Sequence, residues 1–167
     1  MASLNDGKAE AVAWIKEHFN RGSTCLDVGA CGGRWWRLVG DFLTMDAVEI
    51  FEPYIKTGKL HKKYRRVYNV DIREFEYEFY NLVIFGDVLE HMSVEDAQKV
   101  IDYARERCDN MLIAIPYGWK QGAIHGNPYE VHIQDDLTPA LFNERYPGFT
   151  PIYETDLYAY YVMEVKR

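Results

Sequence analysis

The sequence has few cysteines, no long apolar run and no excess of positive charge. Its three cysteines, Cys25, Cys31 and Cys108, form no Cys-x-x-Cys pair, so we expect reduced thiols, a cytoplasmic protein and neither a disulfide framework nor a zinc ribbon. No apolar stretch approaches the roughly 18 residues of a membrane span, and residues 1–8 lack the pattern of a signal peptide. Lys and Arg number 19 against 26 Asp and Glu, which argues against non-specific binding to nucleic acid or to an anionic membrane surface.

The chain is long enough for one domain and is rich in aromatic side chains. Its 167 residues, 48% of them hydrophobic, suit a single domain, which we expect to span residues 1–167. Aromatic residues make up 15% of the chain, with 13 Tyr, 8 Phe and 4 Trp. So much aromatic surface has to lie in a core or line a pocket.

Helix-like and strand-like segments alternate along the chain. Helical spacing predicts helices over 5–20, 34–39 and 93–104, a short one within 51–63 and one that begins at 138. Apolar runs predict strands at 24–28, 44–50, 66–70, 82–85 and 111–115, followed by a hairpin of 149–155 with 157–165. This order indicates an α/β fold with a mostly parallel sheet, helices on both faces and a ligand site at the carboxyl ends of the strands.

A glycine-rich turn follows the first strand. Gly29 and Gly33 permit left-handed backbone and close approach of a ligand, and the next helix offers free N–H groups to it. A dinucleotide fingerprint that starts at Gly29 would place its other glycines at Cys31 and Arg34. The spacing therefore argues against an NAD-dependent dehydrogenase.

Four segments in order resemble the motifs of class I S-adenosylmethionine-dependent methyltransferases. Asp27, Gly29 and Gly33 match the first motif, in which Cys31 replaces a middle glycine. The other three matches are Glu49, 20 residues after Gly29, the segment 69–72 with Asp71, and the segment 80–91, which ends in Leu-Glu-His. Together they cover residues 23–115, and Asn81 departs from the Asp that is usual in the family.

The resemblance implies a Rossmann-like sheet of seven strands with the seventh antiparallel, and S-adenosylmethionine as cofactor. It assigns the ribose hydroxyls to Glu49, the adenine amino group to Asp71, and the methionyl end to Asp27, directly or through the loop. The expected cofactor site comprises Asp27, Gly29, Ala30, Gly33, Trp35, Glu49, Ile50, Asp71, Ile72, Gly86, Asp87 and Val88. Trp35 is equally plausible as a core residue.

His91 is the best candidate for a catalytic base, with Glu90 beside it. It follows the fourth strand, where the transferable methyl group should emerge, and an imidazole titrates near neutral pH. The alternative is that Glu90 and His91 only orient the turn and the start of the next helix.

The segment 115–137 has no clear secondary structure and is rich in aromatic residues and histidines. A loop of this length in a small domain is usually functional, so we expect it to form an acceptor-site wall or lid. Its candidate substrate-binding residues are Tyr117, Trp119, His125, Tyr129, Glu130 and His132. His125, Glu130 and His132 are possible metal ligands, but loop histidines more often form hydrogen bonds, and no metal is expected.

The sequence thus predicts an enzyme that methylates an oxygen or nitrogen of a small molecule or glycan. Two alternatives stay open, an RNA or protein methyltransferase and a non-catalytic module that binds a nucleoside or a partner. The basic stretch 56–66 is interpreted as a solvated helix face, and the oligomeric state is left open as monomer or homodimer. We assign the aromatic residues Trp14, Phe19, Phe42, Phe85, Phe149 and Tyr161 to the core, and Trp35, Trp36, Phe51, Tyr54, Tyr117, Trp119 and Tyr129 to the pocket.

Overall fold

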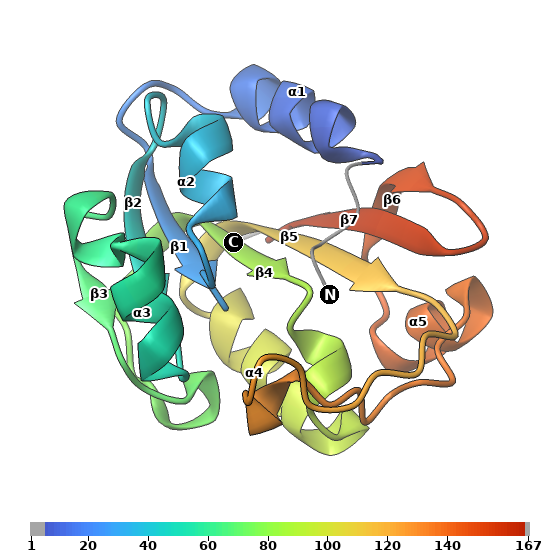
Figure 1. The fold of residues 1–167 in the computed structure, drawn as a ribbon. Coiled ribbons are helices and arrows are strands. Elements are labelled where there is room, and N and C mark those ends of the chain that lie inside the picture. Colours follow the sequence, from blue (N-terminus) through green and yellow to red (C-terminus); the bar gives the residue numbers. More distant parts are fainter. Residues whose placement is uncertain (1–5, 166–167) are drawn as a thin grey trace.

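The computed structural model describes residues 6–165, which form one seven-stranded sheet with helices on both faces (Figure 1). The strands are β1 (Thr24–Val28), β2 (Thr44–Val48), β3 (Val67–Tyr68), β4 (Tyr80–Gly86), β5 (Cys108–Pro116), β6 (Thr150–Glu154) and β7 (Tyr158–Glu164). Their order in the sheet is β3-β2-β1-β4-β5-β7-β6. Strand β7 is antiparallel to β5 and β6, and all other neighbours are parallel. The predicted fold class is confirmed.

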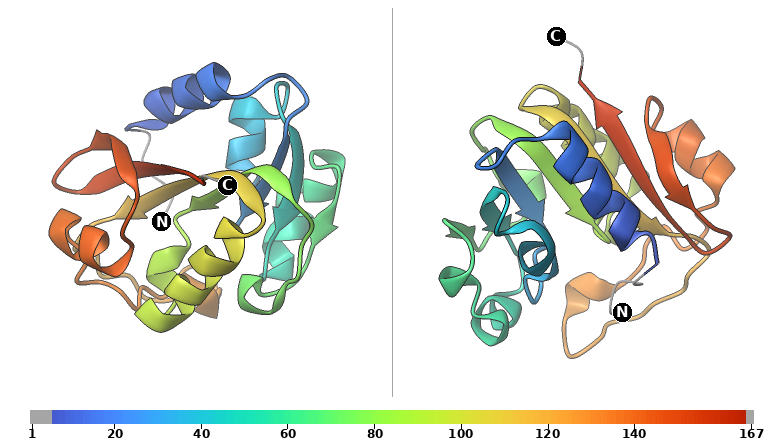
Figure 2. Two further views of the ribbon diagram at one scale, coloured as in Figure 1. Left: turned by 180° about the vertical axis from the view of Figure 1, so that it is seen from behind. Right: turned by 90° about the horizontal axis from the view of Figure 1, so that it is seen from above.

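The helices divide between the two faces of the sheet, as Figures 1 and 2 show. Helices α1 (Lys8–His18), α2 (Arg34–Val39) and α3 (Glu52–Gly58) pack on one face, and α4 (Val94–Arg105) and α5 (Pro139–Arg145) pack on the other. Four 3-10 turns, η1 (Leu60–Lys62), η2 (Ile72–Glu74), η3 (Leu89–His91) and η4 (Pro128–Glu130), complete the described elements. The longest helix, α4, has 12 residues, and no helix in residues 6–165 is suited to crossing a membrane.

Local sequence signals explain where α4 and α5 begin. The Ser93 hydroxyl accepts a hydrogen bond from the Asp96 N–H at 3.1 Å, and the Thr138 hydroxyl accepts one from Leu141 N–H at 3.2 Å. Each side chain satisfies one of the N–H groups that the first turn of a helix leaves free. Pro139 occupies the first position of α5, where its missing N–H costs nothing.

The helix predicted over 5–20 and the strand predicted at 66–70 differ from the structure. Helix α1 begins at Lys8, not at 5, because Gly7 precedes it at φ +79°, where a Cβ would lie 2.4 Å from the Tyr153 ring. Its buried face comprises Lys8, Ala11 and Ile15, whereas Ala9 is exposed. Residue 5, where the predicted helix begins, lies outside the described residues. The strand predicted over 66–70 is shorter in the structure, where β3 has only two residues and is followed by η2.

Three of the six aromatic residues assigned to the core are buried, and the other three are half-buried. Phe85, Phe149 and Tyr161 are buried between the sheet and the helices α4 and α5. The Tyr161 ring stacks on Phe142 of α5 with ring centroids 3.9 Å apart. Trp14, Phe19 and Phe42, also predicted as core, are half-buried against the opposite face.

Candidate functional site

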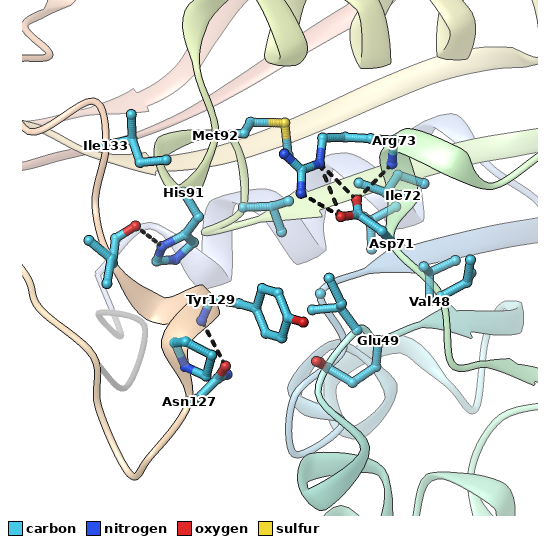
Figure 3. A pocket seen from close by; sticks show the side chains of 17 residues that line it. Val48, Glu49, Asp71, Ile72, Arg73, His91, Met92, Asn127, Tyr129 and Ile133 are labelled. Carbon is cyan, nitrogen blue, oxygen red and sulfur yellow. Dashed lines mark hydrogen bonds and ion pairs between the residues drawn. The ribbon is translucent and has the colours of Figure 1, made fainter.

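A cavity of about 300 Å³ lies at the carboxyl ends of β1, β2 and β3, beside the segment after β4 (Figure 3). The carboxyl ends of parallel strands meet at one edge of the sheet. Strand β2 lies on one side of β1 and β4 on the other. The long loop supplies the opposite wall. The lining residues are Val28, Gly29, Val48, Glu49, Ile50, Val70, Asp71, Ile72, Arg73, Val88, His91, Met92, Asn127, Pro128, Tyr129, Val131 and Ile133.

The glycine turn after β1 packs tightly against the neighbouring segments. The N–H groups of Gly29 and Ala30 both donate to the Val48 carbonyl, at 2.9 and 3.2 Å. Gly29 has φ +69°, and a Cβ there would lie 2.5 Å from the Val88 side chain. Cys31, at the position of the family's middle glycine, also has left-handed backbone, with φ +47°. Gly29, Cys31 and Gly33 therefore all adopt left-handed backbone in this turn.

Glu49, at the end of β2, points into the cavity with its carboxylate held in place. Its two oxygens accept hydrogen bonds from the N–H groups of Cys31 and Phe51, both at 2.8 Å. The side chain is buried, and this burial raises the pKa of the carboxyl group. In the described part of the chain each oxygen accepts one backbone hydrogen bond, and a carboxylate oxygen can accept a second. In Figure 3 the hydroxyl end of the Tyr129 ring points toward Glu49.

Asp71 lines the cavity, but its carboxylate is engaged by Arg73. It caps η2 by accepting from the Arg73 N–H at 2.9 Å, and it forms a two-pronged ion pair with the Arg73 guanidinium. Burial acts to raise the pKa of Asp71, but the Arg73 hydrogen bonds and charge outweigh it, and the pKa is lowered. An adenine amino group would therefore share this carboxylate with Arg73.

Asp27 lies away from the cavity. It is fully buried in β1, and one of its oxygens accepts a hydrogen bond from the Tyr64 hydroxyl. Its other oxygen has no hydrogen-bond partner among residues 6–165. Burial raises the pKa of Asp27 from 3.8 to about 7. Of the two roles predicted for Asp27, this position favours support of the glycine loop from behind over direct contact with the cofactor.

Five other residues predicted for the cofactor site do not line this cavity, namely Ala30, Gly33, Trp35, Gly86 and Asp87. The Trp35 indole is buried against Tyr160. A Cβ on Gly86 would lie 2.4 Å from the Nε1 atom of this indole. Trp35 thus belongs to the core, and Gly86 is required for its close packing. Neither residue lines the larger cavity, and the structure gives both a role in packing.

A second, smaller cavity of about 30 Å³ adjoins the first, and His91 lines both. Asp87 faces it from a left-handed backbone position at φ +58° and accepts a hydrogen bond from the Tyr158 hydroxyl at 2.5 Å. The lining residues are Asp87, Glu90, His91, Pro116, Trp119, Gln121, Glu130, His132, Leu157 and Tyr158.

Glu90, His91 and His132 form a cluster at this second cavity. One ligand atom from each residue lies within 4.8 Å of the others. The two imidazole rings meet edge to face with centroids 4.8 Å apart. Burial lowers the pKa of both histidines and raises the pKa of Glu90 well above its ordinary value.

The long loop is tied firmly to the segment after β4. The N–H groups of Ile133 and Gln134 donate to the Glu90 carbonyl at 2.8 and 3.1 Å, and the Gln134 amide donates to the carbonyls of Leu89 and Met92. Figure 1 shows this loop crossing the edge of the sheet toward η3. It is therefore an ordered wall of both cavities.

The six loop residues predicted for the acceptor site separate into four groups. Trp119, Glu130 and His132 line the second cavity and Tyr129 lines the first. Tyr117 is buried in the core, where its hydroxyl hydrogen-bonds with Tyr161. His125 is exposed in a turn at φ +52° and lines neither cavity.

Asn127, Arg73 and Met92 line the larger cavity but were not predicted from the sequence. The Asn127 side chain accepts from the Tyr129 N–H at 3.0 Å and caps η4, which orients Tyr129 toward the cavity. The Asn-Pro pair is a turn signal in the sequence. Arg73 and Met92 carry no such signal, because their position depends on η2 and η3.

The basic stretch 56–66 is partly structural. Arg65 forms a two-pronged ion pair with the buried Asp46, at 2.9 and 2.7 Å, which the Tyr80 hydroxyl completes at 2.8 Å. Lys63 donates to the Gly32 carbonyl of the glycine turn at 2.8 Å. These side chains stabilise β2 and the turn, so the stretch is not merely a solvated helix face.

Comparisons with known proteins give matches in structure only. No protein-family model and no curated protein matches the chain. A methyltransferase from Clostridium acetobutylicum that depends on S-adenosylmethionine matches with a TM-score of 0.72 and 8% identity, over 95% of this chain and 90% of that one. The N-terminal domain of EvdMO1, crystallised in the presence of S-adenosylhomocysteine and D-fucose, matches with a TM-score of 0.73 and 12% identity, over 98% and 85%.

A third match is the 1,6-didemethyltoxoflavin-N1-methyltransferase of Burkholderia thailandensis, with its substrate and S-adenosylhomocysteine bound. The TM-score is 0.66 and the identity 17%, over 97% of this chain and 80% of that one. Similarity at such low identity establishes the arrangement of the backbone. The chain has the fold of S-adenosylmethionine-dependent methyltransferases, as the motifs in its sequence imply.

Proposed function

We propose that the protein transfers a methyl group from S-adenosylmethionine to an oxygen or nitrogen atom of a small molecule. The observation that carries this proposal is the pairing of Glu49 with the Gly29 turn at the larger cavity. An acceptor carboxylate and a turn without side chains, side by side at the carboxyl edge of this fold, suit a nucleoside. Neighbours in structure that were crystallised with S-adenosylhomocysteine support the choice of cofactor.

In this proposal the ribose lies against Glu49, whose free acceptor positions receive its two hydroxyl groups. The adenine lies between Ile50 and Ile72, with Asp71 and Arg73 at its edge. The apolar side chains of Val28, Val48, Val70 and Val88 supply the rest of the wall. The cavity of about 300 Å³ is at the lower end of the range for small-molecule sites.

The chemistry needs positioning more than activation. The lone pair of the acceptor atom forms a bond to the methyl carbon while the carbon–sulfur bond breaks, and its electrons stay on sulfur as a neutral thioether. The acceptor then loses a proton if it carried one. The sulfonium is already reactive, so the enzyme contributes mainly orientation in line with the carbon–sulfur bond and exclusion of water.

The acceptor is proposed to enter at the second cavity, where His91 borders both spaces. The walls there carry Trp119, Leu157 and Tyr158 beside charged groups, a mixture that suits a small polar or sugar-like molecule. The formal charge of −7 disfavours RNA as acceptor. The EvdMO1 domain crystallised with D-fucose present and the toxoflavin-precursor methyltransferase are consistent with an acceptor of this size.

Calorimetric titration with S-adenosylhomocysteine tests the cofactor assignment, with Glu49→Gln as the variant. Loss of the charged acceptor should weaken binding about 10- to 100-fold, from the 1.5–3 kcal/mol of a charged hydrogen bond. Glu52→Gln is the matched control, because Glu52 lies three residues on, is exposed and pairs only with Lys56 in the described structure. A thermal melt of each variant reports whether the glycine turn, which Glu49 also holds, keeps its fold.

Two results would overturn the proposal. One is failure of wild-type protein to bind either S-adenosylmethionine or S-adenosylhomocysteine at millimolar concentration. The other is equal affinity of wild type and a folded Glu49→Gln variant. Release of S-adenosylhomocysteine in the presence of an acceptor distinguishes a methyltransferase from a module that only binds the nucleoside.

A further inference from the structure

The Glu90 side chain is buried without a counter-ion in the described structure. It is 1% exposed, and neither carboxylate oxygen has a hydrogen-bond partner among residues 6–165. Two acidic side chains, Asp87 and Glu130, add to the effect of burial and raise its pKa further. A buried carboxylate without partners is costly unless a cation or a proton neutralises it. Within residues 6–165, no cationic side chain forms a hydrogen bond or ion pair with the Glu90 carboxylate.

Two histidines present suitable nitrogen atoms to the same place. The Nδ1 atom of His91 faces the Val131 carbonyl at 3.1 Å, and that of His132 faces the Trp119 carbonyl at 2.7 Å. A carbonyl oxygen only accepts, so in each ring Nδ1 carries the proton and Nε2 keeps its lone pair. A hydrogen bond from the second ring nitrogen to a carbonyl is the usual arrangement of histidines that bind metals.

The spacing of the cluster suits one ion. One ligand atom from each of Glu90, His91 and His132 lies within 4.8 Å of the other two. Ligands about 2.0–2.2 Å from a tetrahedral ion lie roughly 3.4 Å apart, so small side-chain rotations would close the site. The second cavity, of about 30 Å³, has the volume of about one water molecule, enough for an ion.

We propose that Glu90, His91 and His132 bind one divalent transition-metal ion, with open coordination positions toward the acceptor. Two imidazole nitrogens and one carboxylate favour ions such as Zn²⁺, Mn²⁺, Fe²⁺ or Co²⁺, whereas Mg²⁺ and Ca²⁺ prefer ligand sets made of oxygen. The expectation of no metal considered His125 with Glu130 and His132. The fold instead exposes His125 and brings His132 to Glu90 and His91.

As a metal ligand, His91 would have a different role from the catalytic base that the sequence predicts. A hydroxyl of the acceptor would occupy an open position on the ion, lose its proton to water more readily, and attack the methyl carbon as described above. That role in catalysis rests on the proposed methyl transfer. Binding of the metal does not, because the three ligands are in place without the cofactor.

Titration of untagged, chelator-treated protein with Zn²⁺ and with Co²⁺ tests the proposal, and Mg²⁺ serves as comparison. We expect one ion per chain and a Co²⁺ absorption spectrum without a thiolate charge-transfer band. Glu90→Gln and His132→Gln should each weaken Zn²⁺ binding at least 10-fold. His125→Ala is the control from the same loop, and Cys31→Ser removes the exposed thiol. Neither substitution should change the affinity.

Thermal melts separate loss of ligands from loss of fold. Zn²⁺ should raise the melting temperature of wild type and leave Glu90→Gln unchanged. Without metal, Glu90→Gln should melt no lower than wild type, because it replaces a buried carboxyl by a neutral amide of the same size. The proposal is overturned if wild type binds no Zn²⁺ or Co²⁺, or if folded Glu90→Gln and His132→Gln bind as tightly as wild type. Separate titration with S-adenosylhomocysteine shows whether the cofactor proposal stands or fails independently.

Discussion

Asp27 should make the protein less stable as the pH rises from about 4 to about 7. In the folded chain its burial raises the pKa from 3.8 to about 7, so the folded state holds a proton that the unfolded state has released. Stability is therefore lost through this interval as the pH rises. A gap of about three pKa units at about 1.36 kcal/mol each sets an upper value of about 4 kcal/mol.

The substitution Asp27→Asn isolates this effect. An asparagine has the same shape and its carbonyl oxygen can still accept from the Tyr64 hydroxyl, but it does not titrate. Relative to wild type, the variant should be near neutral at pH 4 and gain up to about 4 kcal/mol in unfolding free energy by pH 8. Urea denaturation at several pH values measures the difference, and Asp41→Asn, at an exposed position, is the control.

Parallel stability curves for wild type and Asp27→Asn would refute this account of the buried carboxyl. The same variant also tests where the cofactor lies. Asp27 does not line the larger cavity, so Asp27→Asn should change the affinity for S-adenosylhomocysteine less than about threefold. A direct ion pair with the methionyl ammonium would instead cost about 10-fold or more, as charged hydrogen bonds do.

Two further predictions use matched pairs of neighbouring residues. Gly29→Ala should lower the free energy of unfolding by about 2 kcal/mol and weaken binding of S-adenosylhomocysteine, because φ is +69° and the new Cβ would lie 2.5 Å from the Val88 side chain. Gly32→Ala is the control and should be nearly neutral in urea denaturation, because a Cβ there would have nothing within 4 Å. Arg65→Met should cost about 2–4 kcal/mol because it leaves the buried Asp46 without its cation. Arg66→Met removes exposed contacts with Glu78, at 3.7 Å, and with Tyr68, and should change stability by less than about 0.5 kcal/mol. Equal effects of the two substitutions would contradict the role given to Asp46.

The fold could be predicted from local patterns in the chain. Apolar runs, the caps at Ser93 and Thr138 and the glycines of the first turn each act within a few residues, and the structure confirms them. The position of Glu49 in the cavity also followed, because the end of a parallel strand always lies at the same edge of the sheet. The two-residue β3 and the start of α1 were less predictable, since contacts with distant side chains decide them.

Side-chain environments depended on tertiary packing. Tyr117 and Trp35 resemble pocket residues in sequence, yet both are buried, one against Tyr161 and the other against Tyr160. Asp27 matches a motif residue, but its carboxyl faces Tyr64 behind the turn. Which way a side chain points at the end of a strand follows from what packs against it, and spacing along the chain does not contain that information.

By itself, the sequence determined an α/β sheet, predicted a nucleoside-type site at its carboxyl edge and placed Glu90 and His91 together after β4. Only the tertiary structure decided that His132 joins them. Residues 91 and 132 are 41 positions apart, and they meet because the loop hydrogen-bonds to η3 through the Glu90 carbonyl. A loop without periodicity carries no local signal for its path, so its path follows from the hydrogen bonds that its backbone finds on the finished sheet.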